Sequence, residues 1–407
     1  MASLFRPPAA SSRHICSSCL LRRSVLRRQI QWHRRAFQTS VSQNPPIPDF
    51  GFTFDIDGVL VRSSRPIPAA QKALPLLQKN RIPFILVTNG GGKTEEQRVQ
   101  YLQDRLGVPL SADMIVQSHT PFADMTHLYD KTVLIVGGDY DHCQLVAQKY
   151  GFKYAVTPID ILCAHPEIWP FGKQYLDLYR TFAKPLPTPI DLSSPATSLK
   201  FDAIFVYNDS RDWGTDTTII LDLLLSRAGI LGTLSTKNGN PALPNNGYQQ
   251  DAQPPLYYSN PDLWWAAAWH QNRLGQGGFQ RALEGVWAAA TDGAHLAKTA
   301  IGKPTQATFA FAEHRLRHVR KQMFAQRGLN DPLKRVYMIG DNPESDIRGA
   351  NEYRSPHGTV WRSVLVKTGV YRADEGKEPA YRPDVIVEDV LEAVEWAVED
   401  AKKARGG

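Results

Sequence analysis

The sequence predicts an α/β fold: a doubly wound, Rossmann-like parallel sheet with a second α/β domain inserted into it. Short apolar runs alternate with stretches of helical length along most of the chain, which is the element order of a parallel sheet covered by helices. Acidic and polar residues directly follow several of these runs, at the strand ends where open α/β sheets bind ligands. The roughly 355 residues after the N-terminal segment are too many for one hydrophobic core, which predicts two domains.

The expected core domain comprises residues 49–118 and 298–407. Its first strand is a run of phenylalanines that alternate with Gly51 and Thr53, and its second and third strands, at 82–87 and 335–339, are apolar enough to be buried on both faces. The complete set of expected core strands is 50–55, 82–87, 335–339, 359–366 and 384–387, with helices near 67–80, 94–106, 305–327, 344–351 and 388–403.

The inserted domain is expected to span residues 119–297. Two proline- and serine-rich stretches inside it, 164–198 and 237–256, predict loops. Its remaining predicted elements are strands at 132–136 and 201–206 and helices near 140–150, 215–227, 262–272 and 278–290.

A pair of acids, Asp55 and Asp57, ends the first strand. Two carboxylates one residue apart at the carboxyl edge of a sheet can divide two tasks, one as a nucleophile or metal ligand and the other as general acid and base. An Asp-x-Asp pair on its own is more often a solvated turn, so its meaning depends on the partners that the fold brings to it.

Those partners come at the ends of other predicted elements. Thr88, Asn89 and Gly90 follow the second strand and can hydrogen-bond a phosphoryl oxygen. Lys303 precedes a proline and a helix, and Asp341 and Asp346 follow the strand at 335–339. Acids at this density repel one another unless a cation lies among them, and hard oxygen ligands beside a phosphate predict Mg²⁺.

The four elements in this order resemble the motifs of the haloacid dehalogenase (HAD) superfamily of aspartate-nucleophile phosphohydrolases. Asp55-Ile-Asp57-Gly-Val corresponds to the first motif, Thr88-Asn89 to the second, Lys303 to the third and Gly340-Asp341-Asn342 through Asp346 to the fourth. The long segment between the second and third motifs resembles the large α/β cap of subclass IIA. The run from Thr88 to Thr94 and the N-terminal segment resemble the mitochondrial members of the cat-eye-syndrome-critical-region type.

The resemblance implies a role for each core residue. Asp55 would attack phosphorus to form an aspartyl-phosphate, and Asp57 would protonate the leaving oxygen and then activate water. Thr88, Asn89, Gly90 and Lys303 would bind the phosphoryl group, and Mg²⁺ would be held by Asp55, Asp341, Asp346 and the backbone carbonyl of Asp57. The expected enzyme is a phosphoric monoester hydrolase acting on a small phosphorylated substrate. A catalytically idle binding protein that keeps the site is the alternative, and a mutase or phosphotransferase is a third, weaker one.

Substrate choice is expected to lie in the cap, because the core motifs meet only the phosphate. Tyr258-Ser-Asn260-Pro-Asp262 resembles the cap segment that contacts the leaving group in relatives, which makes Asn260 and Asp262 candidate specificity residues. Trp264, Trp265 and Trp269 are expected on one side of the helix at 262–272. Core packing is the first interpretation of this stripe, and an acyl chain or membrane surface against it is the second. Relatives fused to lipid-head-group transferases imply glycerophospholipid metabolism.

Two glycine-rich patterns do not predict nucleotide sites. Gly92-Lys93-Thr94 lacks the glycine that a P-loop requires five residues earlier, where Val87 stands instead. Gly275-Gln-Gly277-Gly278 lacks the strand and spacing of a dinucleotide fingerprint and is expected to begin a helix.

The excess of positive charge lies in the N-terminal segment. The first 48 residues hold eight arginines and no acid, and the rest of the chain has 39 basic residues against 40 acidic ones. This distribution argues against a nucleic-acid surface. Residues 1–44 are expected to be a mitochondrial transit peptide that directs the chain to the matrix, cleaved after Phe37 or near Asn44; a basic tail that binds acidic surfaces is the alternative.

The apolar runs and the cysteines bear on membrane insertion, metal binding and disulfides. No run approaches the roughly 18 apolar residues that a membrane-spanning helix needs. Cys16 and Cys19 lie in the leader and lack the second half of a zinc site, and Cys143 and Cys163 are expected to be free thiols. The sequence leaves the oligomeric state open, a homodimer included.

Overall fold

The computed structural model describes residues 46–329, 331–372 and 378–406. The predicted transit peptide, with Cys16 and Cys19, lies outside them. Residues 47–394 form one unit, which contains both sheets, and a second unit includes residues 395–406, the C-terminal part of helix α11 (Val390–Gly406).

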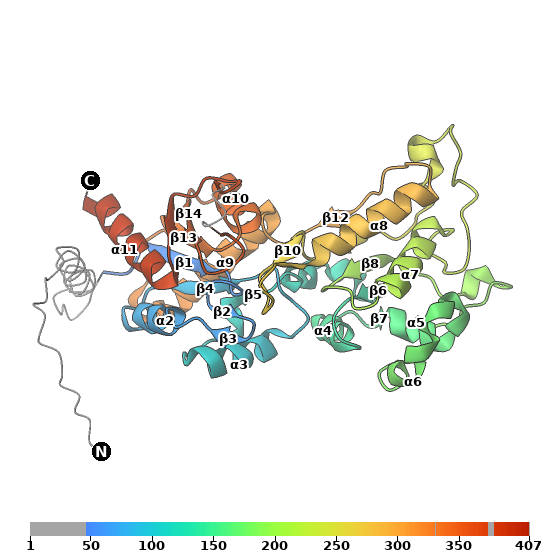
Figure 1. The fold of residues 1–407 in the computed structure, drawn as a ribbon, viewed down its shortest axis with the longest axis horizontal. Helices are drawn as coiled ribbons and strands as arrows, with labels where there is room; N and C mark the ends of the chain where they lie inside the picture. The colour runs from blue at the N-terminus through green and yellow to red at the C-terminus, as the bar shows by residue number, and fades with distance from the viewer. Residues whose placement is uncertain (1–45, 330, 373–377, 407) are drawn as a thin grey trace, which may run out of the picture. The chain divides into compact units, whose positions relative to one another are not determined.

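The first sheet is parallel throughout and confirms the doubly wound α/β prediction. Its strands lie in the order β15-β14-β13-β1-β4-β5, and β1 pairs with β13 on one side and β4 on the other (Figure 1). All five predicted core strands are present, and the two-residue β5 was not predicted. The strands are β1 (Phe50–Phe54), β4 (Phe84–Val87), β5 (Ile115–Val116), β13 (Arg335–Gly340), β14 (Val360–Val366) and β15 (Val385–Val387).

The central strand β1 is buried on both faces. Phe52 and Phe54 are completely inaccessible and their rings stack 5.5 Å apart. The Thr53 hydroxyl, on the opposite face, donates a hydrogen bond to the Met338 sulfur of β13. Because every side chain of β1 is covered, the register that carries its last residues to the sheet edge is strongly specified.

Helices cover this sheet, and their starts agree with the sequence signals. Helix α3 begins with a capping box in which the Thr94 hydroxyl accepts from the Gln97 amide and the Gln97 side chain accepts from the Thr94 amide. The predicted helix at 344–351 is a π-helical turn, Pro343–Ile347, continued by α10. The helices are α2 (Ala70–Lys79), α3 (Glu95–Leu106), α9 (Gln306–Met323) and α10 (Arg348–Glu352), and a small hairpin pairs β2 (Val61–Arg62) with β3 (Arg65–Pro66).

The second sheet is also parallel, in the order β12-β9-β8-β6-β7. The two predicted strands β6 and β8 are confirmed, and the three short strands β7, β9 and β12 were not predicted. The strands are β6 (Thr132–Val136), β7 (Tyr154–Val156), β8 (Ala203–Val206), β9 (Leu256–Tyr258) and β12 (Thr299–Ala300). The domain boundaries at 118 and 298 stay a prediction, and β12 pairs with this sheet although it follows position 298.

The helices of this sheet surround an apolar core built on Phe201, Ile204 and Trp287. Helix α8 begins at the predicted glycine-rich segment, with Gly275 as its N-cap. The two proline- and serine-rich stretches contain one helical turn, α6, and short 3₁₀ turns. The helices are α4 (His142–Tyr150), α5 (Pro158–Ala164), α6 (Leu176–Tyr179), α7 (Trp213–Leu225) and α8 (Gln276–Ala290).

The prediction of a helix at 262–272 is wrong. This segment is an antiparallel ribbon in which β10 (Trp264–Trp265) pairs with β11 (Arg273–Leu274). Three consecutive alanines, 266–268, favour a helix, but Pro261 and Gly275 leave room for only 13 residues, a length that is marginal as a helix without packing. The core interpretation of the tryptophan stripe is also wrong, because Trp264, Trp265 and Trp269 are all exposed.

Candidate active site

The carboxyl ends of three neighbouring strands bring the predicted core residues together. Asp55 follows β1, Thr88 follows β4 and Asp341 follows β13. The backbone amide of Asp55 donates to the Ile339 carbonyl and that of Thr88 to the Val116 carbonyl, both over 2.9 Å, so the sheet ladder continues into the site. The positions of these residues are therefore set by the sheet and not by a loose loop.

Lys303 lies between two of the acids. Its Nζ is 2.5 Å from Asp55 Oδ1 and 2.6 Å from Asp346 Oδ1, and all three side chains are buried. Burial opposes the charge of Lys303, yet the Asp346 and Asp55 carboxylates raise its pKa above its ordinary value. One ammonium group thus holds two carboxylates, each of which would be costly to bury alone.

Asp346 and Asp341 complete a group of three buried acids with Asp55. Asp346 Oδ2 accepts hydrogen bonds from the backbone amides of Asp341 and Asn342, each over 3.1 Å. Asp341 Oδ2 accepts from the Val370 amide over 2.6 Å. One carboxylate oxygen from each of Asp55, Asp341 and Asp346 lies within 4.8 Å of the other two.

Two glycines make room for Asp341. Gly58 has a φ of +95°, which disfavours any side chain, and a Cβ there would lie 2.3 Å from Asp341 Oδ2. A Cβ at Gly369 would lie 1.8 Å from the same oxygen. The carboxylate therefore occupies a recess that larger residues would close.

The electrostatics of the group fit a divalent cation. Burial raises the pKa of Asp55 to about 7, with Asp346 and Asp57 adding to the effect and Lys303 opposing it. Burial and the neighbouring Asp55 and Asp346 carboxylates also raise the pKa of Asp341 well above its ordinary value. A single lysine does not balance three buried acids, and the all-oxygen donor set suits Mg²⁺.

The residues after β4 form the side of the site nearest the cap. The backbone amide of Gly90 donates to Thr88 Oγ1 over 2.9 Å. The Asn89 side chain exchanges hydrogen bonds with the backbone of Lys303, accepting from its amide over 2.8 Å and donating to its carbonyl over 2.9 Å. Asn89 therefore fixes the main chain that carries the lysine.

Asp57 lines the same cavity but has a different partner. Its Oδ2 lies 3.1 Å from Nη2 of Arg98, on the first turn of α3. The sequence analysis did not include Arg98, although the helix after a strand-end motif directs its first turn toward that strand end. Arg98 is thus an additional charged residue of the site.

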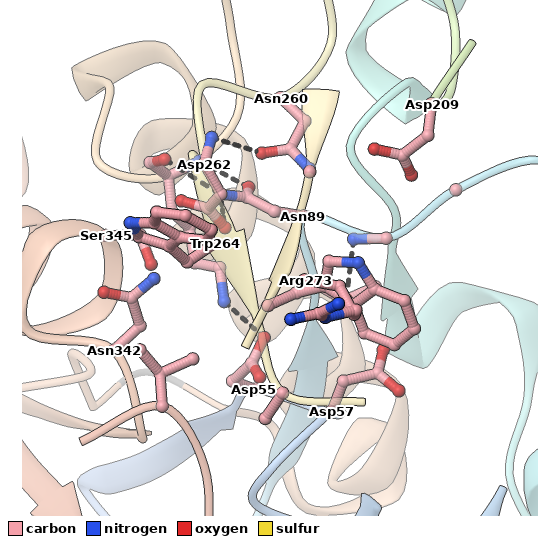
Figure 2. Close-up of a pocket in the computed structure, with 18 of the residues that line it drawn as sticks. Asp55, Asp57, Asn89, Asp209, Asn260, Asp262, Trp264, Arg273, Asn342 and Ser345 are labelled. Atoms are coloured by element: carbon pink, nitrogen blue, oxygen red, sulfur yellow. Dashed lines mark hydrogen bonds and ion pairs between the residues drawn. The ribbon is translucent and has the colours of Figure 1, made fainter. Parts of the chain in front are cut away.

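The two predicted cap residues line the same cavity, beside Asn89. Asp262 Oδ2 accepts from Asn89 Nδ2 over 2.9 Å, which joins the cap segment directly to the second core motif. Asn260 Oδ1 accepts from the Asp262 amide over 2.7 Å (Figure 2). Burial raises the pKa of Asp262 to about 7, and the hydrogen bond from Asn89 opposes the shift.

All ten predicted site residues line one cavity of about 450 Å³. The cavity also includes residues that the sequence analysis missed. The segment Asn208–Arg211 follows β8 and could have been found by the strand-end argument that found Asp55. The hairpin residues Trp264, Trp265 and Arg273 were missed as cavity residues because a helix was expected there.

Other expectations concern thiols and membranes. Cys143 and Cys163 are free, as expected, and Cys143 is fully buried. Across residues 46–329, 331–372 and 378–406, no helix combines the length and apolarity needed to span a bilayer.

Comparison with known proteins identifies the family. Residues 52–153 match the family described as haloacid dehalogenase-like hydrolase, and residues 300–393 match a second HAD-hydrolase-like family. A mitochondrial hydrolase of Saccharomyces cerevisiae is 37% identical over 382 residues, which cover 90% of this chain and 98% of that protein. A cardiolipin synthase/mitochondrial hydrolase fusion protein of Schizosaccharomyces pombe is 38% identical over 369 residues, covering 89% of this chain and 56% of the fusion.

Solved structures share the fold. A protein of Pyrococcus horikoshii aligns with a TM-score of 0.51 at 21% identity, covering 86% of this chain and 99% of that one. A p-nitrophenyl phosphatase of Archaeoglobus fulgidus aligns with a TM-score of 0.52 at 16% identity, covering 87% and 100%. These similarities confirm the predicted family and fold class: the chain belongs to the haloacid dehalogenase-like hydrolases.

Proposed function

We propose that this chain is a mitochondrial, magnesium-dependent phosphohydrolase that cleaves a small phosphomonoester through an aspartyl-phosphate. The observation that carries the proposal is the arrangement of Asp55, which lies against Lys303 within a group of three buried acids. Asp57, a second acid, lines the same cavity. A nucleophile, a cation and a second acid around one cavity are what two-step phosphoryl transfer needs.

In the first step, an Asp55 carboxylate oxygen forms a bond to phosphorus as the bond to the leaving oxygen breaks. Asp57 gives its proton to that oxygen and so avoids release of an alkoxide. In the second step, Asp57 takes a proton from water, the water oxygen bonds to phosphorus, and the bond to Asp55 breaks to release inorganic phosphate.

The surrounding residues hold the phosphoryl group. Lys303 offsets its negative charge, and Thr88 and Gly90 offer a hydroxyl and a backbone close to the strand end. Asp55, Asp341 and Asp346, with the backbone carbonyl of Asp57, would hold Mg²⁺, which when bound supplies positive charge beside the phosphoryl oxygens. Asn260 and Asp262 are proposed to meet the leaving group, because they line the cavity from the cap side.

The relatives support a mitochondrial location for this chain and suggest which substrates to test first. The budding-yeast relative is named a mitochondrial hydrolase, and the fission-yeast relative is a fusion with cardiolipin synthase. We therefore propose a mitochondrial location, with the matrix as the compartment expected from the leader, and begin the substrate search with phosphoesters of glycerophospholipid metabolism.

The test is phosphate release by the full-length protein from a panel of phosphomonoesters, in magnesium or in EDTA. Asp55→Asn removes the nucleophile with little change in shape, and Asp104→Asn removes an exposed acid of α3 as the matched control. Release that requires magnesium, is abolished by Asp55→Asn and persists in Asp104→Asn is the expected result.

One observation favours a second candidate, an idle binding protein. The Asp57 carboxylate that would serve as acid and base is paired with Arg98. A folded protein that binds magnesium and phosphate but releases no phosphate from any ester would overturn the enzyme and leave the binding protein.

A further inference from the structure

The hairpin β10–β11 lies over the catalytic cavity. Trp264, Trp265, Arg273 and Leu274 all line this cavity with Asp55 and Asp57, and Figure 2 shows Trp264 and Arg273 on the cap side of it. This hairpin is therefore, with Asn260 and Asp262, a part of the cap that a bound phosphomonoester would meet beyond its phosphate.

The two faces of the hairpin differ in chemistry. Trp264 is paired with Leu274 and Trp265 with Arg273, and residues directly opposite in an antiparallel pair project from the same face. One face is therefore wholly apolar, and the other combines an indole with a cation.

The indoles are not consumed by packing. Trp264 is 46% exposed and Trp265 43% exposed, and Leu274 is exposed as well. Apolar area left open at the wall of a cavity becomes favourable when a ligand covers it. Trp269, in the same hairpin, is 55% exposed but does not line the cavity.

Arg273 is a cation without an acid. Among the described residues, the Arg273 guanidinium donates hydrogen bonds only to the Asn272 carbonyl and the Gln271 side chain. No carboxylate of the described residues lies within ion-pair distance of it. Arg211, a neighbouring cavity residue, is by contrast paired with Asp139 over 2.9 Å. An anionic group next to Trp265 would therefore find an available guanidinium.

Both ends of the hairpin are anchored before any ligand binds. At its base the Gly275 amide donates to the Leu263 carbonyl over 2.9 Å, and the Gly277 amide donates to the Asp262 carbonyl over 2.8 Å. At its tip the Arg372 guanidinium donates to the His270 carbonyl. A surface held at both ends costs little ordering entropy when a ligand binds.

Resting on the phosphohydrolase proposed above, we propose that this hairpin selects an amphiphilic phosphomonoester. The carbon part of its leaving group lies along Trp265, and a second negative charge on it is received by Arg273, which projects from the same face of the hairpin. The chemistry is shared by soluble acidic organic phosphates and by lipids with a phosphomonoester headgroup.

The first experiment measures kcat/KM of the full-length protein for ethyl, butyl and hexyl phosphate, whose leaving groups have similar acidity. Covering one side of each methylene is expected to raise kcat/KM about twofold per methylene, or about sixteenfold over the four methylenes that separate ethyl from hexyl. Trp265→Ala is expected to flatten this slope, and Trp269→Ala, which removes the exposed indole outside the cavity, is expected to keep it. A flat slope in the wild type, or an equal loss in Trp269→Ala, would overturn the apolar platform.

The second experiment compares hexyl phosphate with 6-phosphohexanoate, which adds a carboxylate to the same chain. The wild type is expected to prefer the carboxylate at least threefold, Arg273→Lys to keep part of the preference and Arg273→Gln to lose it. Arg281→Gln, which removes an exposed arginine on α8 that lies outside the cavity, is the matched control. A preference for the neutral ester in the wild type would overturn the role of Arg273.

Binding separates this inference from the proposed chemistry. Indole fluorescence of Asp55→Asn titrated with hexyl phosphate reports binding to the platform without turnover, and loss of the response is expected when Trp265→Ala is added. Binding without phosphate release would overturn the phosphohydrolase alone, whereas phosphate release with no dependence on chain length would overturn the platform alone. The last experiment offers short-chain phosphatidic acid in phosphatidylcholine vesicles. Its turnover would identify a lipid as the substrate, and turnover of the soluble esters alone would identify a soluble phosphate.

Discussion

Arg98 Nη2 lies 3.1 Å from Asp57 Oδ2, so a core helix holds the second acid of the strand-end pair. The arginine side chain is 12% exposed and the aspartate 36%. Arg98 Nε is buried and has no hydrogen-bond partner among the described residues. Among the residues that the structure describes, Arg98 is the side chain that orients the Asp57 carboxylate.

We expect Arg98→Gln to lower kcat by roughly tenfold, because a misdirected acid delivers its proton less often. Asp57→Asn should cost more, on the order of a hundredfold or above. Steady-state kinetics of both single variants and the double variant measure the coupling. If Arg98 acts through Asp57, Arg98→Gln has no further effect in the Asp57→Asn background; an undiminished tenfold loss there would contradict this role.

Asn89 ties Asp262 to the backbone of Lys303. Its amide nitrogen donates to both Asp262 and the Lys303 carbonyl, and its oxygen accepts from the Lys303 amide. We expect Asn89→Ala to lower the free energy of unfolding by about 1–3 kcal/mol, because it leaves buried polar groups without partners. Urea unfolding measures this change.

Asn89→Asp provides the sharper comparison. It keeps the oxygen that accepts from Lys303 and replaces the donor to Asp262 by a second carboxylate. Repulsion between the carboxylates at positions 89 and 262 should then raise KM, and the additional change Asp262→Asn should bring KM part of the way back to the wild-type value. A KM that rises equally in Asn89→Ala and Asn89→Asp would argue against a direct link between cap and core.

The strand-end argument predicts the site residues that follow the longer strands. Asp55, Thr88 and Asp341 follow strands of four to six residues that are mostly apolar, long enough for their burial to be recognised. The strands β7, β9 and β12 have two or three residues, too few to show a period. The polar residues Asn208–Arg211 follow β8, a strand that the sequence does predict, so the same strand-end argument applies to them.

The hairpin could not be predicted from local preference. The alanines at 266–268 favour a helix, and the ribbon is set by contacts from outside the segment, such as that between Arg372 and His270. The position of Lys303 between Asp55 and Asp346 also could not be predicted from the local sequence. The family resemblance implies it, and the fold explains it by bringing the lysine to the ends of the strands.

Magnesium should stabilise this protein through Asp341. Burial and two neighbouring acids disfavour the ionised form of Asp341, so Asp341→Asn is expected to raise the unfolding temperature without metal. Wild-type protein should gain about 2–3 kcal/mol at a magnesium concentration near 100 times its Kd, and Asp341→Asn should gain almost nothing. Thermal unfolding with and without magnesium measures both effects. An equal magnesium response in the two proteins would exclude Asp341 as a ligand.

A buried histidine should make the protein sensitive to acid. His119 is inaccessible to solvent, and burial lowers its pKa to about 4 although Glu95 opposes the shift. Its Nδ1 lies 2.9 Å from the Tyr150 hydroxyl, and its Nε2 has no partner among the described residues. Protonation of His119 would therefore create a buried positive charge, and the new N–H of Nε2 would have no acceptor among the described residues.

The unfolded chain binds this proton near pH 6.5 and the folded chain only near pH 4. The stabilising contribution of the neutral histidine is thus complete above pH 6.5 and is lost as the pH falls toward 4. At pH 5 the loss should be about 2 kcal/mol relative to pH 7. Urea unfolding at the two pH values measures it, with His119→Gln, which cannot titrate, losing about 2 kcal/mol less than the wild type. His127→Gln replaces an exposed histidine and should behave like the wild type; if His119→Gln also does so, another group is responsible for the acid sensitivity.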